Sequence, residues 1–205
     1  GGRVHLQAPR LASGNDVRIT HKALTDPTRF DSGDTIGTAI TGAASVEAIG
    51  NKVTSYDTAS TTLGTVQMNA IKTDTQTYMS TASAAQARLD PGLGSVLQVR
   101  PGTEVRNSGD LVFSNDYDLG SITAVSGNQP GSLTLRAGGD LLINGNLSDG
   151  FNSATGTTLD SGESWAYRLV AGADLGAANP LAVQRNLPEG GGDFVLKGGK
   201  LIRTG

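Results

Sequence analysis

Short apolar runs, each cut off by glycine or asparagine, recur through the second half of the chain. The stretch 131–151, GSLTLRAGGDLLINGNLSDGF, has apolar residues at 133, 135, 141–143 and 147, and none of these runs is long. Aliphatic runs bounded by turn residues are typical of strands joined by tight turns. The pattern predicts strands at SVLQV (95–99), TEVRN (103–107), DLVF (110–113), SITAV (121–125), SLTL (132–135) and DLLI (140–143).

The spacing of the turns indicates how these strands are arranged. Glycines precede several strands at positions 94, 102, 109, 131 and 139, so neighbouring turns often lie seven or eight residues apart. Three such units, about 22 residues, form one coil that stacks each strand in parallel on its counterpart, about 4.8 Å away. An antiparallel sandwich also contains many short strands and is the alternative.

Three segments follow from this pattern. Segment 1–57 is expected to form coils, with strands around Val17 and Ile19 and again within 31–42. Segment 58–93 is rich in Thr, Ala and Ser, and within it 74–89 predicts a helix that ends at Asp90-Pro91-Gly92. Its buried face is formed by Tyr78, Ala82, Ala85 and Leu89. Segment 94–205 returns to coils and carries a protruding loop at 150–163; the three segments form one continuous structural domain of a longer chain.

Composition restricts the function classes. The 205 residues include 29 glycines and only 4% aromatic residues, which favours narrow rows of Leu, Val and Ile over a core of large rings. The net charge is −3 without a basic block, which argues against a nucleic-acid partner. There is no cysteine, so disulfides and thiolate chemistry are excluded, and no apolar run approaches the roughly 20 residues that span a bilayer.

Several segments resemble large exoproteins of the filamentous haemagglutinin family. These are RPGTEVRNSGDLVFSNDYDL (100–119), the stretch 131–151 quoted above and SWAYRLVAGADLGAANPLAV (164–183), preceded by the helix-like DTQTYMSTASAAQARL (74–89) and the opening GGRVHLQAPRLASG. The similarity covers most of the chain in the family's order. The family's N-terminal secretion domain is not visible, so the chain is expected to be an internal to C-terminal part.

The resemblance implies an all-β fold, a right-handed parallel β-helix with about three short strands per coil and one short surface α-helix. It also implies two-partner secretion through an outer-membrane partner pore, and a rod that is secreted or displayed at a Gram-negative cell surface. The expected function is that of a rigid adhesin-like segment that presents binding loops to a host or bacterial surface glycan or protein, with lateral self-association as a further expectation. The alternatives are a carbohydrate-active protein, such as a lyase or a tailspike-like module, and the stalk of a contact-dependent toxin.

The sequence contains few candidate residues for catalysis or metal binding. Asp110, Asp116 and Asp118 are candidate carboxylates for glycoside cleavage, and Asp116 and Asp118 together with Asn115 offer oxygen ligands for Ca²⁺. Side-chain turns at Asn115 and Asp116 and solvation of Asp118 are the favoured explanation. The histidines, His5 and His21, have no paired-ligand spacing. The stretch 162–166, GESWA, lacks the final glycine of a nucleophile elbow, and no histidine follows it. We therefore expect no enzyme and no cofactor.

Trp165 and Tyr167 are the candidate binding surface. They lie two residues apart, so in a strand both side chains point to the same side. Exposed, they would form a stacking platform for a sugar or a protein; buried, they would close a widened coil. Loop 150–163 is rich in Gly, Asn, Ser and Thr and is either a binding loop on a rigid scaffold or a disordered insertion.

Overall fold

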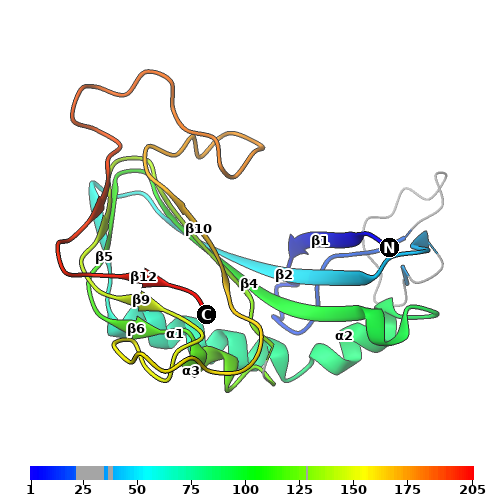
Figure 1. Cartoon of the computed structure of the whole chain (residues 1–205). Helices are drawn as coiled ribbons and strands as arrows, with labels where there is room; N and C mark the ends of the chain where they lie inside the picture. Colours follow the sequence, from blue (N-terminus) through cyan, green and yellow to red (C-terminus); the bar gives the residue numbers. More distant parts are fainter. Residues whose placement is uncertain (22–34, 37–38, 128) are drawn as a thin grey trace. The chain divides into compact units, whose positions relative to one another are not determined.

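The computed structural model describes residues 1–21, 35–36, 39–127 and 129–205 (Figure 1). The strands within these residues are β1 (Arg3–Pro9), β2 (Ser45–Tyr56), β3 (Ser60–Leu63), β4 (Leu97–Asn107), β5 (Asp110–Phe113), β6 (Tyr117–Asp118), β7 (Ser132–Ala137), β8 (Leu141–Ile143), β9 (Leu147–Ser148), β10 (Ala166–Val170), β11 (Phe194–Leu196) and β12 (Ile202–Arg203). The helices are α1 (Thr65–Met79), α2 (Ala82–Leu89) and α3 (Gly120–Thr123), and a 3₁₀ turn, η2, lies at Gly94–Val96.

The chain forms two compact units. The first contains Gly1–Lys52 and Asp74–Gly102, and the second contains Val53–Thr73 and Thr103–Gly205. The elements β2, α1 and β4 contribute residues to both. Each unit has its own hydrophobic core.

In the first unit, β1 and β2 pair in parallel, from Arg3 beside Ser45 to Pro9 beside Asn51. The face predicted for the helix is buried as expected: Tyr78, Ala85 and Leu89 belong to the core of this unit, and Ala82 packs against it. The helix itself is longer and interrupted, because α1 ends at Met79 and α2 begins at Ala82.

Arg10 links the elements of the first unit. Its buried guanidinium donates to the carbonyl oxygens of Gly50 (2.9 Å) and Gly102 (3.1 Å) and to the carboxylate of Asp74 (2.6 Å). It also lies 4.2 Å from the centre of the Tyr78 ring. Burial raises the pKa of Tyr78 to about 12, and the charge of Arg10 opposes this shift. Three polar partners and one aromatic ring thus surround this side chain, and a buried charge requires such partners.

The second unit is built from strands that recur in threes. We call β4–β5–β6 the first layer, β7–β8–β9 the second and β10–β11–β12 the third. Corresponding members of successive layers are neighbours in three sheets, whose orders are β1-β2-β4-β7-β10, β11-β8-β5-β3 and β12-β9-β6. The pairs β5–β8, β6–β9, β7–β10, β8–β11 and β9–β12 are all parallel.

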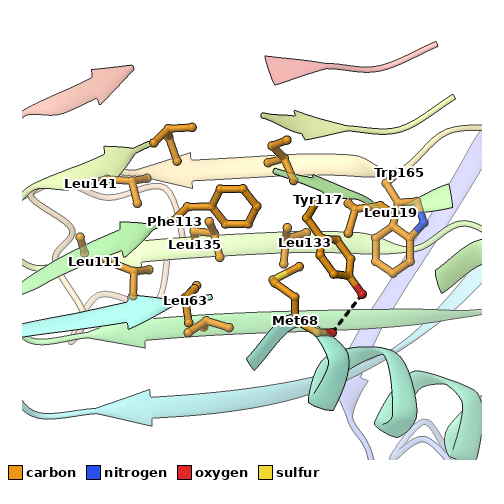
Figure 2. Close-up of a cluster of buried hydrophobic side chains, with 14 of the residues drawn as sticks. Leu63, Met68, Leu111, Phe113, Tyr117, Leu119, Leu133, Leu135, Leu141 and Trp165 are labelled. Carbon is orange, nitrogen blue, oxygen red and sulfur yellow. Dashed lines mark hydrogen bonds between the residues drawn. The ribbon is translucent and has the colours of Figure 1, made fainter. Parts of the chain in front are cut away.

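The core of the second unit consists of columns of apolar side chains that cross the layers. Leu111 of β5 lies beside Leu141 of β8, and Phe113 lies beside Ile143 in the same pair of strands. Figure 2 shows Leu111, Phe113 and Leu141 with Leu63, Met68, Leu133 and Leu135, and the hydrogen bond from the Tyr117 hydroxyl to the Met68 carbonyl. Burial of each aliphatic side chain contributes about 1.5–3 kcal/mol.

Polar columns at the turns connect the same layers. The Asp110 carboxylate accepts the backbone N–H of Asp140 at 2.8 Å, and the Asp140 carboxylate accepts the N–H of Asp193 at 2.8 Å. In the second column, Asp116 accepts from the N–H of Asn146 (2.7 Å), and the Asn146 side chain accepts from the N–H of Leu201 (2.9 Å). Each turn residue therefore pairs a backbone donor in the next layer that would otherwise be unpaired.

The predicted fold class, an all-β right-handed parallel β-helix with one short surface helix, is wrong. The protein is mixed α/β: α1 and α2 stand between β3 and β4, and α3 stands between β6 and β7. The residues 65–89 contain neither glycine nor proline, so nothing interrupts helix formation before position 74. The predicted strand SITAV (121–125) is helical at its start because Leu119 and Ile122, three residues apart, are both buried.

The strand spacing and two other predicted strands also need correction. Hydrogen-bonded turn positions in the first and second layers are 30 residues apart, not about 22, because α3 and its flanking turns lie between β6 and β7. The predicted strands 95–99 and 103–107 merge into one strand, β4, which begins at Leu97 and runs through Pro101 and Gly102, whereas residues 95 and 96 lie in the 3₁₀ turn η2. Val17 and Ile19 are buried but lie outside the named strands. Of the strand expected within 31–42, residues 31–34 and 37–38 lie outside the described residues, and 35–36 and 39–42 belong to no named strand.

Candidate functional site

The second unit has two long loops, which connect β9 to β10 and β10 to β11. The first loop is 150–163, between β9 and β10, and the second loop is 172–192, between β10 and β11. Loops on a rigid strand scaffold are common positions for binding residues. We therefore describe how each is held.

The first loop is folded back into a small hairpin. Phe151 forms an antiparallel bridge with Leu159, and the N–H of Asn152 donates to the Thr158 carbonyl at 3.0 Å. A second backbone bond joins the Asp160 N–H to the Gly150 carbonyl at 2.8 Å. The loop thus has regular internal bonding, which fits a shaped binding loop better than a disordered insertion.

Arg203 of β12 anchors the first loop. Its guanidinium donates to the carbonyl oxygens of Ser153 (3.2 Å), Ala154 (2.8 Å) and Gly156. It also donates to the Ser148 hydroxyl at 3.1 Å and lies 4.3 Å from the centre of the Phe151 ring. A single fork of donors and a cation–π contact therefore fix both the backbone and the aromatic ring of this loop.

The second loop is anchored in a similar way. Ala173 forms an antiparallel bridge with Val183, and the Asp174 N–H donates to the Ala182 carbonyl at 2.9 Å. The buried Arg136 of β7 donates to the Asp174 carbonyl (2.7 Å) and to the carboxylate of Glu104 (3.2 Å). Gln184 completes the anchor by donating to the Gly138 carbonyl at 3.0 Å.

Each loop borders a cavity. One, of about 290 Å³, lies beside the first loop; its lining includes Thr123, Asp149, Asp160 and Glu163. The other, of about 880 Å³, lies beside the second loop and is lined by Asp174, Gln184 and Arg185 among others. The smaller cavity is acidic, and the larger one carries groups of both charges.

Asp149 is the most deeply buried carboxyl group at the smaller cavity. It is 3% exposed, and its Oδ2 accepts the backbone N–H of Trp165 at 2.5 Å. Burial raises the pKa of Asp149, while the N–H groups of Trp165 and Gly150 oppose the rise. The Asp118 carboxyl also has a raised pKa, mainly through burial and partly through the neighbouring charge of Asp160.

The predicted metal ligands are engaged in hydrogen bonds. Asp116 accepts from Asn146 and, at 2.9 Å, from the Lys200 amine, so its pKa is lowered, first by the Asn146 N–H and then by Lys200. Asp118 accepts the N–H of Gly120 (3.0 Å), and Asn115 accepts from the Ser114 hydroxyl (2.8 Å). No group of three or more His, Cys, Asp or Glu that could hold a metal ion occurs among the described residues. The metal role of these residues stays a prediction.

The predicted aromatic surface is mostly inside the second unit. Trp165, which Figure 2 shows among the core side chains, is 3% exposed, and its indole N–H donates to the Thr123 hydroxyl at 2.8 Å. Tyr167 packs against the same core, and its hydroxyl donates to the Arg203 carbonyl at 3.3 Å. Both side chains therefore contact the core, although Trp165 lies just before β10 (Ala166–Val170), and Trp165 offers no ring face to a ligand.

Sequence reasoning missed the anchoring arginines and the second loop. Arg136 and Arg203 contact residues that are up to about 50 positions away in the chain, and no local pattern marks such contacts. The second loop did carry a signal, because 172–192 is rich in Gly, Asn and Pro, but it was interpreted as further coil.

Comparisons with known proteins give no relative for this chain: no family model, curated protein or solved structure matches it. Separately, no helix within the described ranges is both long enough and apolar enough to cross a membrane.

Proposed function

We propose that this chain is a structural segment of a secreted or surface-displayed adhesin-like exoprotein, in which stacked strands present binding loops for attachment to a cell or another surface. The observation that carries the proposal is the anchoring of both loops by arginines that project from strands. Loops fixed in one shape lose less conformational entropy on binding than free loops do. The resemblance of segments 100–119, 131–151 and 164–183 to the filamentous haemagglutinin family supports the same function.

The proposal includes the export route and the partners that the resemblance implies. The exoprotein would pass through a partner pore in the outer membrane of a Gram-negative cell, and its loops would bind a surface glycan or protein. The absence of cysteine fits this route, because an oxidising environment then has no stray thiol to react with.

A test compares binding of the intact chain with two altered forms on a glycan array and on fixed cells. In one form a short Gly-Asn linker replaces 150–163, and in the other Arg203→Ala leaves the loop intact but removes its anchor. We expect the first form to lose binding and the second to bind about tenfold more weakly, because a loosened loop must be ordered again on binding.

The matched control is Arg168→Ala. Arg168 is an arginine on β10 of the same unit, and its Nη1 is buried without a hydrogen-bond partner among the described residues. Its removal should leave binding unchanged. Full binding by the loop-replaced form would exclude the first loop as the binding element, and no binding of the intact chain to any surface would contradict the proposed function.

The acidic cavity supports a second candidate, a carbohydrate-active protein. A buried carboxyl with a raised pKa, such as that of Asp149, has the property of a general acid, and Asp160 and Glu163 line the same cavity. Release of reducing ends from a polysaccharide, lost on Asp149→Asn, would favour this candidate over attachment.

A further inference from the structure

The larger cavity, beside the second loop, has a lining from two parts of the second unit. Ser108 and Gly138, which follow β4 and β7, line one part, and residues of the second loop line the rest. Figure 1 shows this loop, in orange, beyond the ends of the strands. The volume of about 880 Å³ lies within the range of about 300–1,000 Å³ that is typical of sites for small ligands.

Backbone hydrogen bonds hold the second loop in one shape around this cavity. The Gln184 N–H donates to the Gly172 carbonyl at 2.8 Å, and the Gly176 N–H donates to the Asp174 carboxylate at 3.0 Å. These bonds add to the one from the Asp174 N–H to the Ala182 carbonyl. A lining that is already ordered loses little conformational entropy when a ligand binds.

Asp174 and Arg185 bring opposite charges to the cavity without pairing with each other. Both residues line it, and Arg185 is exposed. Among the described residues, the Arg185 side chain forms no hydrogen bond and no ion pair. The buried Arg136 donates to the backbone carbonyl of Asp174 and not to its carboxylate. The cavity therefore presents a cation and a carboxylate that are both available to a ligand.

Two amide side chains add neutral hydrogen-bonding groups. The Gln184 Nε2 donates to the carbonyl oxygens of Gly138 (3.0 Å) and Ala173 (3.1 Å). Because both partners are acceptors, the orientation of this amide is fixed and its Oε1 is left as an acceptor. Asn186 lines the same cavity, and no residue that the structure describes forms a hydrogen bond with its side-chain amide.

The apolar part of the lining is aliphatic. It includes Leu175, Ala177 and Val183, and Val183 is 57% exposed. None of the residues that line the cavity is aromatic, and none belongs to a named strand. Peptides are commonly bound along strand edges or in apolar grooves, and this lining offers neither. It suits a small hydroxylated ligand that also has a C–H face.

A sugar that carries a carboxylate matches these groups. The planar guanidinium of Arg185 pairs with a carboxylate through two parallel hydrogen bonds. Ring hydroxyls donate to the Asp174 carboxylate and to Oε1 of Gln184. A neutral sugar uses the second set of contacts only, and a simple anion such as phosphate uses the first set only.

We propose that the larger cavity is a binding site for a carboxylate-bearing sugar, such as a uronic acid, within a surface glycan. Arg185 binds the carboxylate, and Asp174 and Gln184 bind hydroxyls. The inference rests on the proposed function, because it names the class of glycan and adds a second site to that of the first loop. Attachment to a surface then uses both loops, since two linked weak sites bind much more strongly than either alone.

Isolated trisaccharides test the site separately from attachment. The probes are trigalacturonate and the neutral trisaccharide of galactose, each titrated into the intact chain and followed by amide chemical shifts. We expect trigalacturonate to bind at least about tenfold more tightly, because only this probe forms the charge-assisted pair with Arg185. The shifts should be confined to 172–192 and the turns after β4 and β7. The form in which a linker replaces 150–163 should bind trigalacturonate like the intact chain.

Two variants should have different patterns. Arg185→Gln should weaken binding of trigalacturonate about tenfold and leave binding of the neutral probe unchanged, because it removes only the partner of the carboxylate. Asp174→Asn should weaken both probes, because it changes a group that binds hydroxyls. The asparagine keeps an oxygen for the Gly176 N–H, so the loop should retain its shape.

The matched control is Lys197→Gln. Lys197 is exposed in the same unit but does not line the cavity. This variant changes the net charge by the same amount as Arg185→Gln, and binding of both probes should stay unchanged. An equal loss in both variants would mean that trigalacturonate is attracted by overall charge, and the assigned site would be wrong.

Equal affinity for the two probes, or full binding of trigalacturonate by Arg185→Gln, would overturn the proposal. If the intact chain still attached to cells and lost attachment on replacement of 150–163, only the site at the second loop would be rejected. Conversely, a chain that bound trigalacturonate through Arg185 but attached to no surface would retain this site and contradict the proposed function.

Discussion

Gly145 is predicted to be indispensable because the turns of successive layers touch there. A Cβ on Gly145 would stand 2.2 Å from the backbone C and O atoms of Asn115 and 2.7 Å from the N of Asp116. Contacts with backbone cannot be relieved by rotation of a side chain. One turn would have to move by more than about 1 Å to reach a normal separation, and overpacking of this kind typically costs 1–3 kcal/mol.

The same displacement strains the neighbouring hydrogen bonds. Asn146 donates twice to Asp116, from its backbone N–H at 2.7 Å and from its side-chain amide at 3.1 Å, and each bond contributes about 1 kcal/mol. We therefore expect Gly145→Ala to lower the free energy of unfolding by about 3 kcal/mol. Urea denaturation followed by circular dichroism measures this as a lower midpoint with an unchanged m value.

Gly198→Ala is the matched control for this prediction. A Cβ at Gly198 meets nothing within 4 Å, and its φ is not in the left-handed region. Its unfolding free energy should stay within about 0.5 kcal/mol of the parent. If Gly145→Ala behaves like Gly198→Ala, then the turns at 114–116 and 144–146 are not in contact, and the pairing of β6 with β9 is wrong.

The remaining predictions concern pH dependence and fluorescence. The pKa of Asp116 is lowered below its ordinary value of 3.8, so its stabilising effect is present above that value and is lost as pH falls through the folded-state pKa. The pKa of Asp149 is raised, so its relative stabilisation is present below 3.8 and is lost as pH rises through the folded-state pKa. Asp116→Asn should therefore lower the urea midpoint at neutral pH but not in acid. Asp149→Asn should change the urea midpoint more favourably at neutral pH than in acid. If both variants shift the midpoint with the same pH dependence, the assignment is contradicted. The single tryptophan, Trp165, is buried and hydrogen-bonded. Its fluorescence emission should therefore be blue-shifted and poorly quenched by acrylamide until the second unit unfolds. Acrylamide quenching of the native protein as strong as that of free indole would contradict its burial.

The sequence identifies the short strands of the second unit well because each is a local feature. DLVF at 110–113 coincides with β5, and SLTL and DLLI overlap β7 and β8. The same reasoning fails at SITAV, because β-branched residues favour a strand locally while burial of Leu119 and Ile122 selects a helical turn. Helix α1 was shortened in the prediction for a related reason: its threonines obscure the spacing of Met68 and Ile71.

The candidate site was harder to predict because its contacts are long-range. The first loop was recognised from its composition, but its anchor, Arg203, lies about 50 residues further along the chain. Asp116 and Asp118 were selected for their alternation, whereas their partners, Asn146, Lys200 and Gly120, follow from stacking and turn geometry. The alternating charged residues therefore locate the turns in the sequence, but they do not predict the hydrogen bonds that these side chains form.

The spacing between parallel layers explains why the strands are interrupted by glycine and by Asp or Asn. Parallel layers are separated by the spacing of a sheet, about 4.8 Å, so the turns that connect strands must stack as closely as the strands do. Glycine is required where two turn backbones meet, as at Gly109, where a Cβ would lie 2.2 Å from the Ala59 carbonyl oxygen. Asp or Asn is required where the next turn brings a backbone N–H that has no other acceptor. The Asp110 carboxylate, for example, accepts the N–H of Asp140. The words SGDLVFSND and GGDLLINGN are similar because both satisfy these two demands at the same positions, and this requirement would hold whatever the loops bind.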